Sequence, residues 1–293
     1  MSSPLPKISI VTPSFNQAAF LEETLLSVFE QNYPALEYIV MDGGSNDGSD
    51  DIIRKYQDRL THWESAPDKG QYDAINRGFA QSTGEVMAWL NSDDKLTPWA
   101  LKVVGEIFAE HPEIEWLTTA YPMHWDIYGR ATHCGYNGGY SREGFFRGEH
   151  LPFGHWHARG WIQQESTFWR RSLWERAGGG LDPSFSLAGD LELWARFYKH
   201  AELCAVATPL GGFRVHPAQK TALRAEDYSE QAKRAFLLHG GRIPSRAQNF
   251  VNGWLAKLIR FLQRRYDRRL NGLPGAKLCF HRGMEGGWNI MDT

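Results

Sequence analysis

Cysteine is scarce in this chain of 293 residues, and its three copies, Cys134, Cys204 and Cys279, lie far apart. Such a set has neither the close spacing of a zinc site nor the even number that a disulfide framework requires. We therefore expect a reducing compartment, the cytoplasm in particular.

An excess of charge of one sign is also absent. The 32 Lys and Arg residues nearly balance the 34 Asp and Glu residues, and the net charge of -2 argues against nucleic acid as a partner. No apolar run reaches the length that spans a bilayer, and the first residues lack the apolar core of a signal peptide. We therefore expect no transmembrane helix.

A dinucleotide-binding fingerprint is missing too. The first predicted strand, residues 7–15, ends in TPSF, and the second, residues 36–41, leads directly into DGG. No Gly-x-Gly-x-x-Gly follows either of them. That motif lets a helix N-terminus approach a pyrophosphate, so its absence disfavours an enzyme that transfers hydride.

What the chain does contain is a regular alternation of apolar strands and amphipathic helices. Further strands are predicted at 61–65, 86–90, 114–119 and 203–209, with helices between them. This alternation predicts an α/β fold with a mostly parallel, Rossmann-like sheet and flanking helices. The pattern breaks into an irregular, aromatic-rich stretch at 120–160, and after residue 225 it is mainly helical.

Two adjacent carboxylates, Asp93 and Asp94, follow the strand at 86–90, which is apolar on both faces. Open α/β sheets bind ligands at the carboxyl ends of their strands. Carboxylate oxygens there suit Mg²⁺ or Mn²⁺, which usually bridge to substrate phosphates. Asp also favours helix caps and turns, so the pair alone leaves both alternatives open.

Asp42 ends the second strand and begins the segment DGGSNDGS. A carboxylate at this position can accept hydrogen bonds from a ribose or from a base N–H. The alternative is a plain strand–helix turn, because Gly, Asn and Asp dominate turns. The residues themselves favour neither of the two.

Five motifs carry a resemblance to a known family. TPSFNQ, DGGSNDGS, PDKGQYDAINRG, WLNSDD and GDLELW, in this order, resemble the family 2 glycosyltransferases, over roughly residues 7–220. Each motif is modest, but five in register are specific. The resemblance implies the GT-A fold, an inverting reaction, a nucleotide-sugar donor and Mn²⁺ or Mg²⁺ as cofactor.

The resemblance also implies a nucleotide-sugar site. Thr12, Pro13 and Ser14 would line the nucleobase and ribose site, and Asp42 would accept from the base. The complete expected set is Thr12, Pro13, Ser14, Asp42, Lys69, Asp73, Asn76, Asn91, Ser92 and Arg214.

For the metal, the resemblance implies Asp93 as the main ligand. Asn91 stands where the family's Asp-x-Asp motif has its first acid, and a neutral amide contributes less to cation binding. Asp94 would compensate, directly or through water.

The segment FRVHPAQK resembles the family's FR-x-H-x-x-Q. His216 would complete the metal shell or bond the diphosphate, unless it is structural. Arg214 and Lys220 would neutralise phosphate.

Asp190 matches the acid of the family's Glu-Asp motif, with Gly189 in place of the Glu. The resemblance implies that Asp190 is the general base, which a partly desolvated carboxylate does well. Asp190 could also cap the following helix. Glu192 is the second candidate base, but it is expected to face solvent or to pair with Arg196.

Trp161 and Gln164 match a segment that often faces the acceptor, although Trp161 could instead belong to the core with Phe168 and Trp169.

Residues 250–270 read as a basic amphipathic helix, which would bind anionic lipid or pack on the catalytic domain. We therefore divide the chain into a nucleotide-sugar-binding half (1–120), an acceptor-binding and catalytic half of the same domain (121–224), and a C-terminal helical extension (225–293).

These features predict an inverting glycosyltransferase that uses a UDP-sugar above other donors. Its acceptor would be a glycan or a lipid-linked sugar of surface polysaccharide biosynthesis, reached in the cytoplasm or at the inner face of the membrane. One alternative is an inactive nucleotide-sugar-binding module, which Asn91 and Gly189 suggest. The other is a nucleotidyltransferase, which would need a Gly-rich basic loop that the residues TPSFNQ do not provide.

Overall fold

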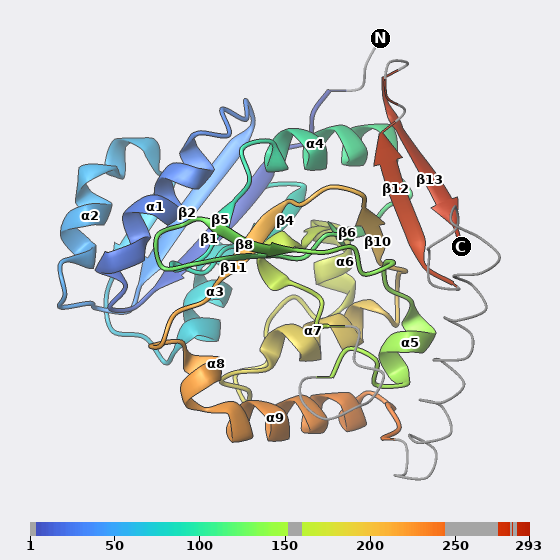
Figure 1. Ribbon diagram of the computed structural model, residues 1–293. Helices are drawn as coiled ribbons and strands as arrows, with labels where there is room; N and C mark the ends of the chain where they lie inside the picture. Colours follow the sequence, from blue (N-terminus) through green and yellow to red (C-terminus); the bar gives the residue numbers. More distant parts are fainter. Residues whose placement is uncertain (1–3, 152–159, 244–274, 282, 284–285) are drawn as a thin grey trace.

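The computed structural model describes residues 4–151, 160–243, 275–281, 283 and 286–293 (Figure 1). Its centre is a nine-stranded sheet in the order β13-β12-β10-β6-β9-β4-β1-β2-β3. These strands are β1 (Ile8–Ser14), β2 (Leu36–Asp42), β3 (His62–Ser65), β4 (Val86–Trp89), β6 (Trp116–Thr119), β9 (Phe168–Arg170), β10 (Cys204–Val206), β12 (Lys277–His281) and β13 (Trp288–Asp292). Among them β9 and β13 pair antiparallel, and the other pairings are parallel. The predicted α/β fold with a mostly parallel sheet is confirmed.

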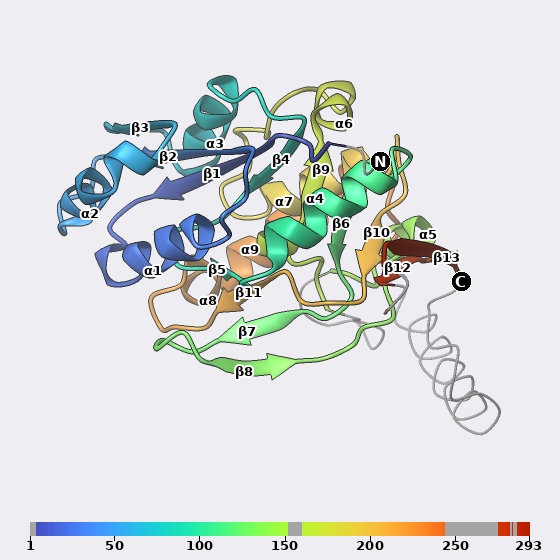
Figure 2. The same cartoon turned by 90° about the horizontal axis from the view of Figure 1, so that it is seen from above.

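Helices cover both faces of this sheet, which explains why its central strands are apolar throughout. Figure 2 shows α1 (Ala18–Phe29) and α4 (Ala100–Glu110) on one side of the sheet and α3 (Gln71–Ala80) and α6 (Arg171–Arg176) on the other. The buried residues of α7 (Gly189–Phe197) pack in the same core as those of α3. Alternate residues of a strand point to opposite faces. In β1, Ile8 and Ile10 accordingly pack in the core of the first side and Val11 in the core of the second. The remaining short helices near this sheet are α2 (Ser49–Lys55) and the 3-10 turns η1 (Gln57–Arg59) and η2 (Gln164–Ser166).

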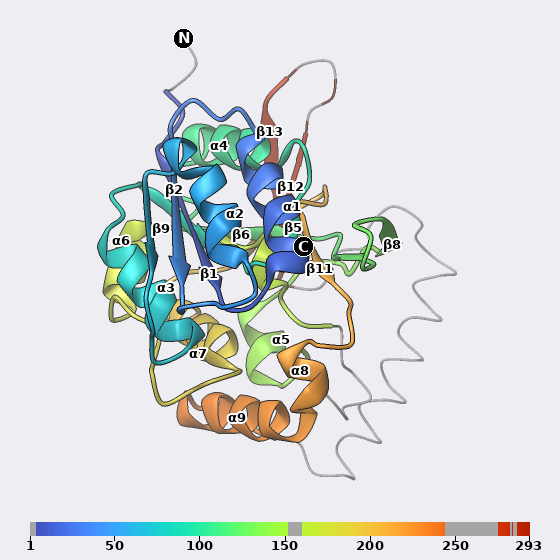
Figure 3. The same cartoon turned by 90° about the vertical axis from the view of Figure 1, so that its left-hand side faces the viewer.

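The register brings the polar ends of the central strands together. Ser14 of β1 lies opposite Asp42 of β2, and Val11 lies opposite Trp89 at the end of β4. The carboxyl ends of β1 and β2 point toward the side of the molecule on which α8 (Lys220–Leu223) and α9 (Ala225–Leu238) lie (Figure 3). The motifs after β1 and β4 therefore face the C-terminal half of the described chain.

The stretch at 120–160, expected to be irregular, contains regular elements. β7 (Met123–Trp125) and β8 (Ala131–Cys134) join β5 (Lys95–Leu96) and β11 (Gly211–Arg214) in a second sheet of order β5-β11-β7-β8, and α5 (Arg142–Phe146) follows. Elements of three to five residues are too short for a hydrophobic period to emerge, which is why the sequence pattern missed them.

The prediction of a helical C-terminal extension is wrong for residues 277–281 and 288–292, which form strands. α8 and α9 are helical, but β12 and β13 form a hairpin that pairs with β10 and so widens the main sheet. Both strands are short and a Gly-rich segment joins them, which is a hairpin signal rather than a helical one. The predicted amphipathic helix at 250–270 lies outside the described residues. No helix in the described part of the chain combines the length and the apolar character that crossing a bilayer requires.

Candidate active site

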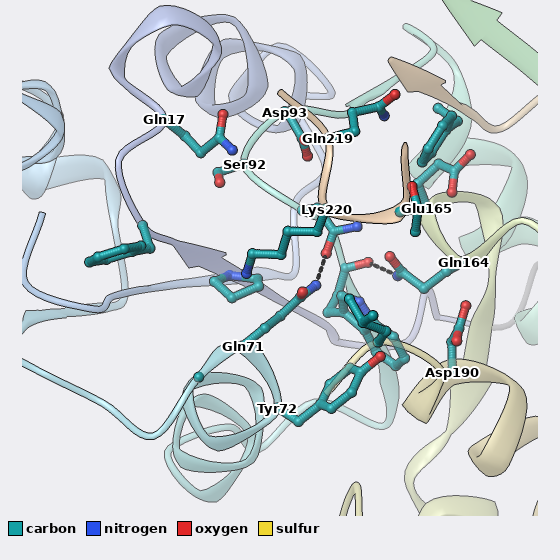
Figure 4. Close-up of a pocket in the computed structure, with 18 of the residues that line it drawn as sticks. Gln17, Gln71, Tyr72, Ser92, Asp93, Gln164, Glu165, Asp190, Gln219 and Lys220 are labelled. Carbon is teal, nitrogen blue, oxygen red and sulfur yellow. Dashed lines mark hydrogen bonds between the residues drawn. The ribbon is translucent and has the colours of Figure 1, made fainter. Parts of the chain in front are cut away.

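A cavity of about 970 Å³ opens beyond the carboxyl ends of β1 and β4. Pro13 and Ser14 line it from the end of β1, and Asp93 lines it from the loop after β4. The opposite walls come from the starts of α3, η2, α7 and α8, which supply Gln71, Tyr72, Gln164, Glu165, Asp190 and Lys220 (Figure 4). Segments far apart in the sequence thus share one pocket.

Asp93 and Asp94 have opposite surroundings although they are neighbours. Asp93 lines the cavity, and its Oδ2 lies 3.0 Å from Nε2 of His216. Asp94 is only 1% exposed and accepts hydrogen bonds from the backbone N–H of Arg214 (2.8 Å) and from Nδ2 of Asn91 (3.2 Å). Burial raises the pKa of Asp94 well above its ordinary value, and the charges of Asp93 and Glu165 add to the effect.

This arrangement bears on the expected metal. Mg²⁺ and Mn²⁺ are usually held by one or two carboxylates together with substrate phosphates. Asp93 at the cavity wall fits such a site; His216 is buried and does not line the cavity, and it reaches the site through its contact with Asp93. Within the described residues, no cluster of three or more acidic, His or Cys side chains could hold a cation alone. Asp94 does not fit the expected ligand role, because its carboxylate already accepts from donors inside the protein.

Arg214 was expected to neutralise phosphate, but its guanidinium is buried away from the cavity. Its Nε donates to the backbone carbonyl of Asp93 (2.5 Å), and its Nη2 pairs with Glu23 (2.7 Å). It therefore fixes the loop that carries Asp93 instead of facing a ligand. Lys220, at the start of α8, does line the cavity.

The side chains of two further residues expected at the nucleotide point into the protein. Thr12 is buried, and its hydroxyl shares a 3.0 Å hydrogen bond with Tyr38. Asn76 bonds both the N–H and the carbonyl of Leu181 through its side-chain amide. Both side chains therefore hold neighbouring segments together, and neither lines the cavity.

Asp42 is likewise committed to the turn that follows β2. Its Oδ2 accepts from the backbone N–H groups of Gly44 (3.1 Å) and Ser45 (2.9 Å), and from the hydroxyl of Ser65 (2.7 Å). These bonds favour the turn alternative over contact with a base.

The other expected nucleotide-sugar residues fall into two groups. Pro13, Ser14, Asn91 and Ser92 line the cavity. Asn91 is held there by Gln71, whose Nε2 donates to Asn91 Oδ1 at 2.7 Å. Lys69 and Asp73 do not line it. The Asp73 carboxylate accepts from the backbone N–H of Lys69 (3.2 Å) and shapes the loop at the cavity edge.

Asp190 lies in the first turn of α7, and Ala188 is the N-cap, so Asp190 is not the cap of this helix. Its Oδ1 is buried and has no hydrogen-bond partner. Burial raises the pKa of Asp190 from 3.8 to about 6. A carboxylate in this state is well suited to take a proton near neutral pH.

Gly189, where the resemblance expects Glu, has no room for a side chain. An added Cβ would lie 2.6 Å from the ring of Tyr72, and the Gly189 N–H donates to the Tyr72 hydroxyl at 2.8 Å. The close approach of α3 and α7 explains the glycine.

Glu192, the second candidate base, is engaged elsewhere. It pairs with Arg196 (2.7 Å), as expected, and also with His239 (2.8 Å), and it is buried instead of solvent-exposed. Both oxygens of Glu192 are therefore engaged, whereas Asp190 Oδ1 has no hydrogen-bond partner.

The expected acceptor residues both line the cavity. Trp161 is 43% exposed, and its ring is stacked near His124 with centroids 6.2 Å apart. Gln164 donates from Nε2 to the carbonyl of Trp89 (2.5 Å), which leaves its buried Oε1 without a partner. Phe168 and Trp169 are core residues.

Sequence reasoning missed Gln71, Tyr72 and Glu165. Glu165 is fully buried in the cavity wall, and burial, with the charges of Asp190 and Asp93, raises its pKa to about 8. The sequence does contain a signal for Glu165. This acid directly precedes a segment that includes the core residues Phe168 and Trp169, and acids are almost never fully buried unless they are paired.

The architecture defines the class: an α/β sheet of the GT-A kind, with acidic residues around a cavity at the carboxyl ends of its strands. The family model described as glycosyl transferase family 2 matches residues 9–164, more than half of the chain. The chain belongs to this family.

Among curated relatives, an uncharacterized glycosyltransferase (alr2836) of Nostoc is 38% identical over 111 residues, 35% of this chain and 33% of the relative. A β-1,3-glucosyltransferase of Campylobacter jejuni that acts on GalNAc(5)-diNAcBac-PP-undecaprenol is 32% identical over 104 residues, 34% of each protein. In these matches, the alignment spans about a third of the relative's length.

Two solved structures share the fold. Staphylococcus aureus TarS 1-349 in complex with UDP-GlcNAc superimposes with a TM-score of 0.61 at 15% identity, covering 89% of this chain and 76% of the TarS 1-349 chain. The mannosyltransferase PcManGT of Pyrobaculum calidifontis, in complex with GDP-Man and Mn²⁺, gives 0.58 at 17% identity, covering 92% and 78%.

Proposed function

We propose that this chain is an inverting glycosyltransferase that moves a sugar from a UDP-sugar to a hydroxyl of a glycan or lipid-linked acceptor. One observation carries the proposal. A single cavity has Asp93 on one wall and Asp190 on another, and Asp190 has a buried, unpartnered oxygen and a pKa of about 6. These are the two carboxylates that such a reaction needs, one for the donor and one for the acceptor.

On the acceptor side, Asp190 takes the proton from the hydroxyl as its oxygen attacks the anomeric carbon. Because the α7 backbone fixes the carboxylate and burial desolvates it, little reorganisation is required when the proton moves. One displacement inverts the anomeric centre, so no covalent sugar–enzyme intermediate is required.

On the donor side, Asp93 and His216 would hold Mn²⁺ or Mg²⁺ against the diphosphate. When bound, the cation neutralises the charge of the leaving nucleotide. Lys220 adds positive charge at the same cavity, and Pro13, Ser14, Asn91 and Ser92 enclose the nucleotide. The complexes of the similar structures with UDP-GlcNAc and with GDP-Man and Mn²⁺ support this kind of donor.

The alternatives have less support. An inactive binding module would not need the buried, unpartnered carboxylate of Asp190. A nucleotidyltransferase would need a basic, Gly-rich loop after β1, and family membership also points away from it.

Two variants test the proposal. We expect Asp190→Asn to keep its affinity for a UDP-sugar with Mn²⁺ and to lose about 10²–10⁴-fold in transfer rate, the usual contribution of a general base. We expect Asp93→Ala to lose the Mn²⁺-dependent part of UDP affinity, measured by calorimetry. Transfer by Asp190→Asn within tenfold of the parent rate would contradict the assignment of the base, and unchanged Mn²⁺-dependent affinity in folded Asp93→Ala would contradict the donor site.

A further inference from the structure

Three buried oxygens on one wall of the cavity lack a hydrogen-bond partner: Gln164 Oε1, Glu165 Oε1 and Asp190 Oδ1. The proposed mechanism uses only Asp190. A buried acceptor without a partner costs free energy, so such atoms in a native fold usually await a ligand or a water. Gln164 and Glu165 are adjacent in η2, and the proposed mechanism uses neither Gln164 Oε1 nor Glu165 Oε1.

The wall that carries them is rigid. Ser166 exchanges hydrogen bonds with both the N–H and the carbonyl of Gly211 in β11, each at 3.1 Å. Thr167 bonds the hydroxyl of Thr118 at 3.0 Å, and Gln164 is fixed by its bond to Trp89. Side chains held in this way are preorganised to recognise a ligand.

The position of the wall indicates which part of a ligand it meets. Figure 4 shows Glu165 and Gln164 between Asp93 and Asp190, and the charges of both aspartates act on Glu165. On the proposed function, the leaving phosphate lies near Asp93 and the attacking hydroxyl near Asp190. The sugar ring in transit must therefore occupy the space beside Glu165.

We propose that Glu165, together with Gln164, hydrogen-bonds hydroxyl groups of the transferred sugar and that this sugar carries no carboxylate. The inference rests on the proposed function and adds a substrate class to it. Oxygen acceptors side by side match the vicinal hydroxyls of a hexose.

The exclusion of acidic sugars follows from charge. Asp93, Glu165 and Asp190 line one cavity, and Lys220 is the one Lys or Arg that lines it within the described ranges. Burial already raises the pKa of Asp190 to about 6 and that of Glu165 to about 8, so this environment disfavours negative charge. The carboxylate of a uronic acid would meet the same desolvation and the same repulsion.

The test compares UDP with UDP-glucose, UDP-galactose, UDP-N-acetylglucosamine and UDP-glucuronate, each with Mn²⁺, by calorimetry on the full chain. For Glu165→Gln we expect UDP affinity to stay within twofold of the parent chain. The tightest neutral UDP-sugar should weaken by about tenfold, as expected when one buried hydrogen bond to the sugar is lost. Glu165→Ala should weaken it further, and if that variant does not fold, the isosteric Glu165→Gln decides alone. UDP-glucuronate should bind the parent chain at least about tenfold more weakly than that neutral sugar.

Glu30→Gln, an exposed glutamate at the end of α1, is the matched control and should change nothing. Equal loss of UDP and UDP-sugar affinity, no loss at all, or a rise in acceptor KM alone would overturn the role of Glu165. Preference for UDP-glucuronate would overturn the substrate class. A parent chain that binds none of the four sugars would overturn the proposed function itself, and this inference with it.

Discussion

Asp93 and Asp94 show how two adjacent residues of one type come to have different chemistry. The turn after β4 directs Asp93 to the cavity, while the backbone of β11 and Asn91 enclose Asp94. A motif in the sequence specifies that both are acids, but only the tertiary contacts decide which one can meet a ligand.

This difference yields a prediction. Asp94→Ala should lower the free energy of unfolding by about 1–3 kcal/mol, because it leaves the buried N–H of Arg214 without an acceptor. It should retain Mn²⁺-dependent UDP binding in the folded protein, whereas Asp93→Ala should show the reverse pattern. Urea unfolding and calorimetry measure the two quantities. Loss of Mn²⁺-dependent binding in folded Asp94→Ala would reinstate Asp94 as a ligand.

If Asp190 is the base, as we propose, the transfer activity depends on pH. Because burial raises its pKa to about 6, the base form is lost below that value, and the transfer rate should rise with pH through about 6 and level off above it. A pH–rate profile measures this. A rate that does not change between pH 5 and pH 8 would contradict Asp190 as the base.

The same shift affects stability, with the opposite sign. The folded state binds the Asp190 proton more tightly than the unfolded state, so its stabilising contribution is complete below pH 3.8 and is lost as pH rises through about 6. Asp190→Asn should therefore melt at a higher temperature than the parent chain at pH 8 but not at pH 4. A difference in melting temperature that is the same at both pH values would point to a cause other than ionisation.

At the scale of elements, α7 is fixed to its neighbours by a buried charge network. Glu192 accepts from Arg196 and His239, and the Nζ of Lys199 lies 2.8 Å from the second ring nitrogen of His239. Burial alone would raise the pKa of Glu192, yet the hydrogen bonds from His239 and Arg196 hold it below its ordinary value. The network ties the helix that carries Asp190 to the end of α9.

Removing one member of this network should be costly. Glu192→Ala should lower the free energy of unfolding at pH 7 by about 3–5 kcal/mol, because it leaves buried positive charge without its partner. Since the folded pKa is lowered, the difference should be complete above pH 4.5 and should shrink as pH falls below that value toward the folded pKa. Urea unfolding at several pH values measures it, with the exposed Glu230→Gln as control. A loss no larger than that of the control would contradict the role of the network.

The sequence predicted most elements of the main sheet, because each combines an apolar run with turn residues at its ends. It missed β5, β7, β8, β9, β11, β12 and β13, which are short strands whose pairing with other strands supplies what their own sequence lacks. At the site, motif matching named Pro13, Asp93, Gln164 and Asp190, which do line the cavity. It could not foresee that Thr12, Asp42, Asn76 and Arg214 bond to the protein itself, because side-chain direction depends on packing.

At the scale of the whole molecule, β12 and β13 complete the core beside β10. Trp288 of β13 is buried, its indole N–H donates to Glu106 (3.2 Å), and its backbone N–H donates to Glu110 (2.8 Å) on α4. The hairpin also covers β10, whose pairing edge would otherwise be open.

Trp288→Ala should therefore lower the free energy of unfolding by about 3–5 kcal/mol, the usual cost of deleting a buried aromatic side chain. Tyr128→Ala, at a site that is 72% exposed, should change it little. Thermal and urea unfolding of both variants measure the contrast. Equal stability of the two would mean that the hairpin contributes nothing to the core.

The cavity takes its walls from residues between Pro13 and Tyr228. During synthesis, the strand ends that bear Pro13 and Asp93 leave the ribosome first, while Asp190 and Lys220 follow about a hundred residues after Asp93, at roughly 5–20 residues per second. A ribosome-bound chain that stops before Asp190 has the sheet edge but lacks the base that we propose. On the proposed mechanism, the site is therefore complete only after the chain has been made past Lys220.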